Sequence, residues 1–201
     1  MNLETRTEVK KIIFNIIGVA FIGFGFALMA SSGIGLDCLD SFNEALSVFV
    51  NRDFSVVASA VELIMILVAY VLDKDKIGLG TILYMLIIDI PLSFFEGLLP
   101  NSGSFVLSVI YSLMGVVFLA FGIELTIHTG LGTVAYEAFI YGLKKKLEFS
   151  FVMTKYIVDG ILLVFVVLLG HRIELGTIIY FVSCPLIMEQ MSKLIKKHVK
   201  I

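Results

Sequence analysis

Six apolar runs, each long enough to cross a lipid bilayer as one helix, follow one another along the chain and constrain its fold more than any other feature. One crossing takes about 20 apolar residues, so six crossings with short loops account for nearly all of the 201 residues. The runs are Ile12–Ser32, Ser55–Leu72, Gly78–Leu99, Ser104–His128, Phe149–Leu169 and Leu175–Ile195. We therefore predict an all-α polytopic membrane protein whose first run is a retained span, because that run is too long for a cleavable signal.

The composition agrees with membrane residence and argues against several other classes of protein. Hydrophobic residues make up 59% of the chain, charged residues 16%, and the mean hydropathy is +1.02. We expect no large soluble domain, and a net charge of −2 gives no field that would attract nucleic acid. The motifs of zinc hydrolases, serine hydrolases and phosphate-binding loops are absent, so we expect no enzyme activity, cofactor or metal. We interpret Cys38 and Cys184 as packing residues.

Two shorter segments of mixed polarity, 34–50 and 131–143, each accompany a Gly-x-Gly sequence. Glycine has no Cβ and loses the most backbone entropy in a helix, so such pairs interrupt helices or let backbones approach closely. Two interpretations remain open: the glycines break a membrane-inserted segment beside a pathway, or they form surface loops that lead into interfacial helices. The helix-break glycines are Gly33, Gly35, Gly130 and Gly132.

The two halves of the chain, residues 1–100 and 101–201, resemble each other. The sequence GVAFIGFGFALMASSGIGL, beginning at Gly18, aligns with GVVFLAFGIELTIHTGLGT, beginning 97 residues later at Gly115. Chance similarity between apolar segments does not explain coincident glycine and acidic positions. We predict one membrane domain built from two repeats, each with three transmembrane helices and one short broken or re-entrant helix.

The basic residues predict the orientation, because the cytoplasmic loops of membrane proteins are enriched in Lys and Arg. If 34–50 and 131–143 do not cross, twelve basic residues collect on one side and two, Arg52 and Arg172, on the other; if both segments cross, the distribution is eleven to three. The first arrangement also avoids burying three carboxylates in a full crossing. We therefore expect a bacterial inner membrane location with both termini cytoplasmic. The twelve residues are Arg6, Lys10, Lys11, Lys74, Lys76, Lys144, Lys145, Lys146, Lys193, Lys196, Lys197 and Lys200.

Three crossings per repeat would place the second repeat upside down relative to the first. Inverted repeats with interrupted helices are a recurrent plan of transporters, in which the binding site lies at the repeat interface near the membrane midplane. Irregular backbone at that depth is tolerated only where it is buried in protein or lines a wet cavity.

Several short motifs resemble those of the YczE/YyaS/YitT family of bacterial integral membrane proteins. They are the stretch Gly33–Glu44, the GLGT at Gly78–Thr81 and the ELGT at Glu174–Thr177. The first motif of that family reads roughly Gly-Leu-Gly-Pro-Trp-Asp. The stretch from Gly35 to Asp40 keeps the acidic residue but replaces Pro-Trp with Cys38-Leu39. The resemblance covers essentially the whole chain and implies an integral membrane protein, but little about its activity.

Glu62 and Asp159 are matched carboxylates, 97 residues apart, inside the second span of each repeat. A carboxylate in the hydrocarbon core costs about 3 kcal/mol or more, so such residues are candidates for function. They could bind a cation or carry a proton. For Asp159 an alternative remains open, because Lys155 lies four residues earlier on the same helix face and could neutralise it.

Asp40 and Glu137 form a second matched pair, each five residues after the second glycine of its Gly-x-Gly. They fall in the first turns of the short helices, where the helix dipole alone would stabilise them. The other interpretation is that they face a central cavity and select cationic or amine-bearing solutes. An excess of intramembrane carboxylates over the single Lys155 favours a cationic solute or proton coupling. Further acidic residues in or near the spans are Asp89, Glu96 and Glu124.

The motif Leu-Gly-Thr-Ile-x-Tyr begins the third span of each repeat, with Thr81 and Tyr84 matching Thr177 and Tyr180 at an offset of 96. Small residues allow close helix contact and threonine hydroxyls bond across helices, so packing is one role for the motif. The alternative is that the threonine hydroxyls and tyrosine rings line the substrate site, where aromatic faces suit a cation.

These observations predict a transporter or facilitator of a small cationic or amine-bearing solute, with proton coupling through the buried carboxylates. Two alternatives remain open: a non-transporting accessory or scaffold protein, and the substrate-capturing subunit of a multi-component importer. The partners that we expect are the lipid bilayer and the solute, with a homodimer left open and no nucleic acid.

Overall fold

The computed structural model describes residues 3–199, and every regular element in that range is helical. Lys200, one of the twelve basic residues used for the orientation, lies outside the described residues. The elements are α1 (Leu3–Ser32), α2 (Cys38–Val50), α3 (Phe54–Asp73), the short 3₁₀ helix η1 (Lys74–Lys76), α4 (Leu79–Ile87), α5 (Asp89–Leu98), α6 (Phe105–Thr129), α7 (Ala135–Leu147), α8 (Phe151–Leu168) and α9 (Leu175–His198).

Six helical segments are long and apolar enough to cross a membrane, and the chain is a multi-pass membrane protein. Each of the six predicted apolar runs corresponds to one of them, so this prediction is confirmed. The segments are Thr5–Ser32, Phe54–Lys76, Leu79–Leu98, Phe105–Thr129, Phe151–Leu168 and Leu175–His198.

The third of these segments is interrupted, which the hydropathy pattern does not predict. Helix α4 ends at Ile87 and α5 begins at Asp89, although Ile88 N still donates to the carbonyl of Tyr84 over 2.9 Å. Pro91 has no N–H to offer the carbonyl of Ile87, four residues earlier, and this missing bond accounts for the break.

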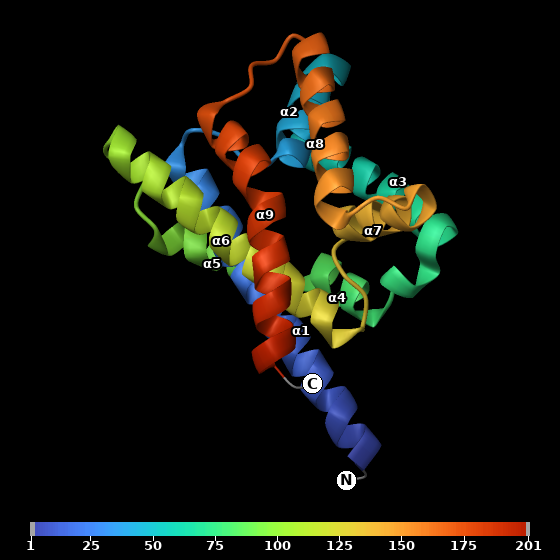
Figure 1. Cartoon of the computed structure of the whole chain (residues 1–201). Helices are drawn as coiled ribbons and strands as arrows, with labels where there is room; N and C mark the ends of the chain where they lie inside the picture. The colour runs from blue at the N-terminus through green and yellow to red at the C-terminus, as the bar shows by residue number, and fades with distance from the viewer. Residues whose placement is uncertain (1–2, 200–201) are drawn as a thin grey trace.

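Helices α1 and α6 cross in close contact at the centre of the molecule (Figure 1). A Cβ atom built on Gly18 would lie 2.9 Å from the carbonyl oxygen of Gly122, and one built on Gly25 would lie 2.7 Å from that of Gly115. Residue numbers therefore rise along one helix as they fall along the other, so the two helices are antiparallel. Glycine at these four positions lets the backbones meet, as in other small-residue interfaces between membrane helices.

The remaining long helices flank this central pair. Helices α4 and α5 pack against α1, whereas α9 packs against α6. Two backbone hydrogen bonds hold the starts of α4 and α9: Gly80 N donates to Leu131 O over 2.7 Å, and Gly176 N donates to Ile34 O over 2.6 Å. Each of these two starts is thus held by a Gly-x-Gly loop from the other half of the chain.

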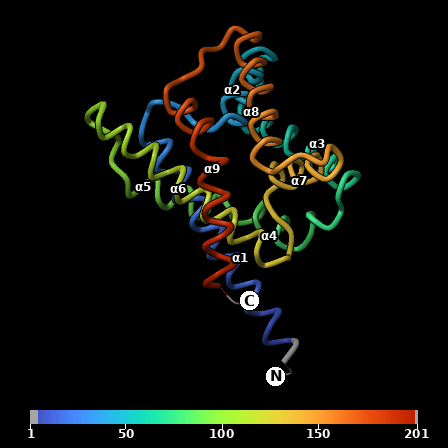
Figure 2. The backbone as a smooth tube through the Cα atoms, in the orientation of Figure 1, coloured from blue at the N-terminus to red at the C-terminus, as the bar shows by residue number. Residues whose placement is uncertain are grey.

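The short helices α2 and α7 each contain 13 residues. At 1.5 Å per residue they are about 20 Å long, less than the roughly 30 Å hydrocarbon core of a bilayer. Both pack between α3 and α8 (Figure 2). Helix α7 begins and ends later than the predicted segment 131–143, and the three lysines from Lys144 to Lys146 lie in its last turn.

The two ends of the described chain lie at the same end of the molecule (Figure 2). His128 Nε2, at the end of α6, lies 2.9 Å from the carbonyl of Val199 after α9. On α7, Lys145 donates to Asp73 over 2.7 Å, and this hydrogen bond and the carboxylate charge raise the pKa of the exposed ammonium.

Candidate functional site

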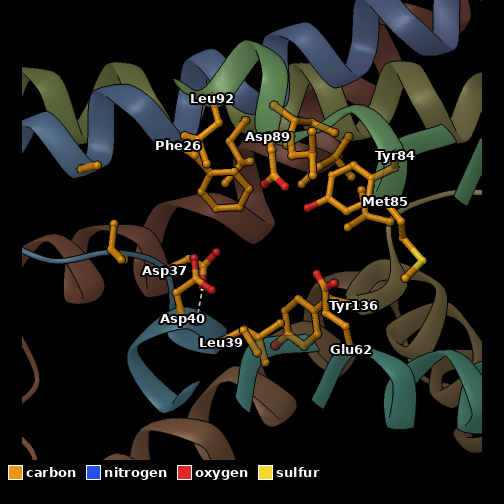
Figure 3. Close-up of a pocket in the computed structure, with 18 of the residues that line it drawn as sticks. Phe26, Asp37, Leu39, Asp40, Glu62, Tyr84, Met85, Asp89, Leu92 and Tyr136 are labelled. Atoms are coloured by element: carbon orange, nitrogen blue, oxygen red, sulfur yellow. Dashed lines mark hydrogen bonds between the residues drawn. The ribbon is translucent and has the colours of Figure 1, made fainter. Parts of the chain in front are cut away.

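A cavity of about 480 Å³ opens among the helices of the first half of the chain and the start of α7 (Figure 3). Helices α1, α2, α3, α4 and α5 supply most of the lining, and α6, α7 and α9 complete it. Helix α8 contributes no lining residue. The volume suits a small organic solute, since ligand pockets commonly enclose about 300–1,000 Å³.

Carboxylates dominate the polar part of this lining. None of the residues that line the cavity in the described part of the chain is Lys, Arg or His. A concave site of one charge sign attracts and retains ligands of the opposite sign. The six lining carboxylates are Asp37, Asp40, Glu62, Asp89, Glu96 and Glu137.

Asp37 and Asp40 lie together at the start of α2 (Figure 3). Asp37 caps the helix, because its Oδ1 accepts a hydrogen bond from Asp40 N over 2.7 Å. An N-cap carboxylate satisfies an otherwise unpaired helix N–H and benefits from the positive end of the helix dipole. The cap fixes this end of α2 beside the cavity, where both side chains are lining residues.

Three tyrosines contribute aromatic surface to the lining: Tyr84, Tyr136 and Tyr180. Tyr84 is 6% exposed, and its hydroxyl points into the cavity (Figure 3). Within residues 3–199 that hydroxyl makes no hydrogen bond. Because the hydroxyl faces the cavity without a protein partner, a bound water or solute is its natural hydrogen-bond partner.

A buried ion cluster lies next to two of these tyrosines, Tyr136 and Tyr180. Lys155, with 0% exposure, places Nζ 3.5 Å from Glu137 Oε1 and 3.8 Å from Asp159 Oδ2. Its ammonium also lies 4.4 Å from the ring centroid of Tyr136 and 5.5 Å from that of Tyr180. The Tyr136 hydroxyl donates a short hydrogen bond to Asp159.

The structure therefore separates the residues that the sequence analysis grouped together. Asp40, Glu62, Glu137, Tyr84 and Tyr180 all line the cavity. Asp159 does not; it is fully buried, 3.8 Å from Lys155 as the i,i+4 alternative predicted, and it accepts a hydrogen bond from Tyr136, which itself lines the cavity.

Thr81 and Thr177 are not among the residues that line this cavity. Thr177 Oγ1 is 2.9 Å from Ser41 Oγ, and Thr81 Oγ1 accepts from Gly78 N over 3.3 Å. Both threonines face the Gly-x-Gly loops where α4 and α9 begin, and packing at that contact is their role.

The four helix-break glycines do not line the cavity themselves, although Leu36 and Asp37, which follow Gly35, do. Gly35 and Gly132 adopt φ of +119° and +105°, and a Cβ on either would collide with Thr177 or Thr81. Gly33 and Gly130 are exposed residues with positive φ at the ends of α1 and α6. The glycines instead fold the loops against the opposite half of the chain, a conformation that glycine adopts without strain.

Glu124 does not line the main cavity. It lines a smaller cavity of about 250 Å³ near the chain ends, together with Lys76, His128 and Lys196. Its carboxylate is thus accompanied by cations and does not add to the acidic lining of the main cavity.

Asp37 and Tyr136 are among the lining residues that the sequence did not predict as site residues. Asp37 could be found as an N-cap residue three positions before Asp40, the usual spacing for a capping bond. Tyr136 carries no such signal, because its role depends on the approach of α8. Among the described residues, no three His, Cys, Asp or Glu side chains converge to hold a metal ion, and both cysteines are buried free thiols.

Comparisons with known proteins place the chain in a family without naming an activity. No curated protein and no solved structure matches it. The model of a family of unknown function, DUF6198, matches residues 9–193, which is most of the chain. The chain therefore belongs to the family of unknown function DUF6198.

Proposed function

We propose that this protein is a transporter or facilitator that moves a small cationic, amine-bearing solute across the bacterial inner membrane. The observation that carries the proposal is the cavity of about 480 Å³ with six lining carboxylates and, among the described residues, no lining cation. Ionisable groups are rare inside membrane helices and there usually mark substrate or ion pathways. The lining charge would select against anions and favour an ammonium group.

The proposed architecture consists of two inverted repeats of three spans each. It is supported by contacts that recur at the spacing of the sequence repeat. Gly18 and Gly25 of α1 meet Gly122 and Gly115 of the antiparallel α6, and in each helix the second glycine of the pair lies seven residues after the first. An in-plane two-fold axis would relate antiparallel helices in this way.

The two loop contacts support the same architecture. Ile34 and Leu131, which accept the backbone bonds at the starts of α9 and α4, are 97 residues apart. Their donors, Gly176 and Gly80, are 96 apart. In this arrangement α2 and α7 enter the membrane without crossing it, both termini are cytoplasmic, and the lysines of α7 face the cytoplasm with them. The resemblance to the YczE/YyaS/YitT family remains a prediction beside this proposal.

The first test is a thermal-stability screen of the purified protein against primary amines, metabolic cations and neutral analogues, at two pH values. A ligand at 100 times its Kd adds about 2.7 kcal/mol of stability, which a thermal shift detects readily. The comparison is between wild type and an Asp40→Asn, Glu137→Gln double variant. The matched control is Asp75→Asn, which also removes a carboxylate, but an exposed one on η1 that does not line the cavity. Stabilisation by amines that the control keeps and the double variant loses supports the proposal.

Uptake of the solute into proteoliposomes tests whether transport is coupled to protons. Glu62→Gln should abolish the pH dependence of uptake while leaving the folded yield intact, since Glu62 lines the cavity and has no ion-pair partner among the described residues. An unchanged pH profile would remove this role. If no amine in the screen raises the melting temperature, the transport proposal is contradicted and the accessory, scaffold or substrate-capturing alternatives are favoured.

A further inference from the structure

The ammonium group of Lys155 is surrounded by side chains of the second half of the chain as a bound ligand would be by its binding site. Its side chain beyond Cα is chemically an n-butylammonium group, held between two carboxylates, 3.5 Å from Glu137 and 3.8 Å from Asp159. Two tyrosine rings, those of Tyr136 and Tyr180, surround the same ammonium. Paired carboxylates and aromatic faces are the groups that recognise ammonium cations.

The first half of the chain carries the matching residues without the lysine. At the repeat offset of 97, Glu137 and Asp159 correspond to Asp40 and Glu62, and Lys155 corresponds to Ala58. At the offset of 96, Tyr180 corresponds to Tyr84. The exception is Tyr136, which corresponds to Leu39.

All five of these residues of the first half line the cavity, which is where the absent lysine would lie. Helix α3 lines the cavity with Ala58 and Glu62, four residues apart on one helix face. Helix α8, whose matching face carries Lys155 and Asp159, has no lining residue. Where α3 has the small Ala58 facing the cavity, α8 has the 0% exposed Lys155 at the matching position.

We infer that the cavity contains a binding site for a primary alkylammonium group beside Ala58, between the carboxylates of Asp40 and Glu62 and against the ring of Tyr84. The inference rests on the proposed function and deepens it by locating the solute's ammonium and naming its class. The solute supplies the positive charge that Lys155 supplies to the other half. Tyr84 is 6% exposed, and its hydroxyl faces the cavity without a hydrogen-bond partner in residues 3–199, which is an independent indication that a polar ligand completes this site.

The experiment builds the missing lysine into the first half. Ala58→Lys should place an ammonium in the site, and Ala58→Met is its control of similar length without charge. The probe is n-butylammonium chloride, with 1-butanol as the neutral probe, and the readouts are the melting temperature of each purified variant and its shift with probe concentration.

We expect n-butylammonium, but not 1-butanol, to stabilise wild type. Ala58→Lys should bind n-butylammonium about 10- to 100-fold more weakly than Ala58→Met does, the range for losing one charge-assisted interaction. Without probe, Ala58→Lys should melt above Ala58→Met, and adding Glu62→Gln should remove that difference, because the built-in ammonium then loses a partner.

The outcomes separate this inference from the proposed function. If n-butylammonium stabilises wild type but Ala58→Lys binds it as Ala58→Met does, the proposed function stands and the location is wrong. If no amine, n-butylammonium included, stabilises wild type, the binding site and the transport of amines are both refuted, whatever the melting temperature of Ala58→Lys. If Ala58→Lys melts below Ala58→Met, the lining does not accept an ammonium there and the inference is overturned.

Discussion

Replacing Lys155 with methionine should destabilise the protein more than any other single loss of a lysine. The ammonium is 0% exposed and separates two carboxylates, Glu137 and Asp159, that are themselves 2% and 0% exposed. Without it, two carboxylates remain in the interior with no cation within 4 Å among the described residues. Removing one partner of a buried ion pair costs about 3–5 kcal/mol, because the remaining charge keeps its desolvation penalty.

The assay is reversible unfolding of the purified protein in mixed micelles, followed by circular dichroism. For a chain of this size, about 1 kcal/mol corresponds to roughly 2–4 °C in melting temperature, so Lys155→Met should melt at least about 6 °C below wild type. A triple variant that adds Glu137→Gln and Asp159→Asn should recover most of the loss, since the amides leave no buried charge. The matched control is Lys145→Met, whose ion pair with Asp73 has a 62% exposed ammonium and should cost less than about 1 kcal/mol. A Lys155→Met protein as stable as the Lys145→Met control, or a triple variant no better than the single one, would refute the reasoning.

Three further predictions concern the packing of α1 on α6, the hydroxyl of Tyr136 and the orientation of the chain in the membrane. Gly25→Leu should lower the folded yield and reduce the free energy of unfolding by about 3 kcal/mol or more, because its Cβ would lie 2.6 Å from the backbone of α6. The control Gly97→Ala, whose Cβ would have nothing within 4 Å, should be neutral or slightly stabilising. Equal stability of the two variants would contradict the close crossing of α1 and α6. Tyr136→Phe should reduce the free energy of unfolding by about 1–3 kcal/mol in the same assay, because the buried carboxylate of Asp159 loses the hydroxyl that donates to it. An unchanged stability would show that this hydrogen bond is unimportant. Single cysteines at Arg52 and Lys74 should react with a membrane-impermeant maleimide from the periplasmic and the cytoplasmic face, respectively. The reverse pair of faces would show that α2 crosses the membrane, and labelling of both from one face would rule out a spanning α3.

Much of the helical framework follows from the sequence alone, because hydropathy and helix interruption are local properties. Apolar runs of spanning length predict the six membrane-spanning segments, and the glycines at 33 and 130 mark where α1 and α6 end. The break between α4 and α5 was missed, although Pro91 carries its signal, because its neighbours are apolar enough to hide it in a hydropathy window. The internal repeat, read from the sequence, stays a prediction that the reciprocal glycine contacts support.

Which carboxylates share the cavity is decided only by the tertiary structure. Sequence spacing pairs Glu62 with Asp159 and treats them as equivalent, yet one lines the cavity and the other is sealed behind Lys155. The spacing predicts the contact of Lys155 with Asp159 on its own helix, but its contact with Glu137 requires α7 to pack on α8. Helical periodicity determines which residues share a helix face. What that face meets depends on side chains from segments distant in the chain, and here a single long lysine fills on one side the space that stays open on the other.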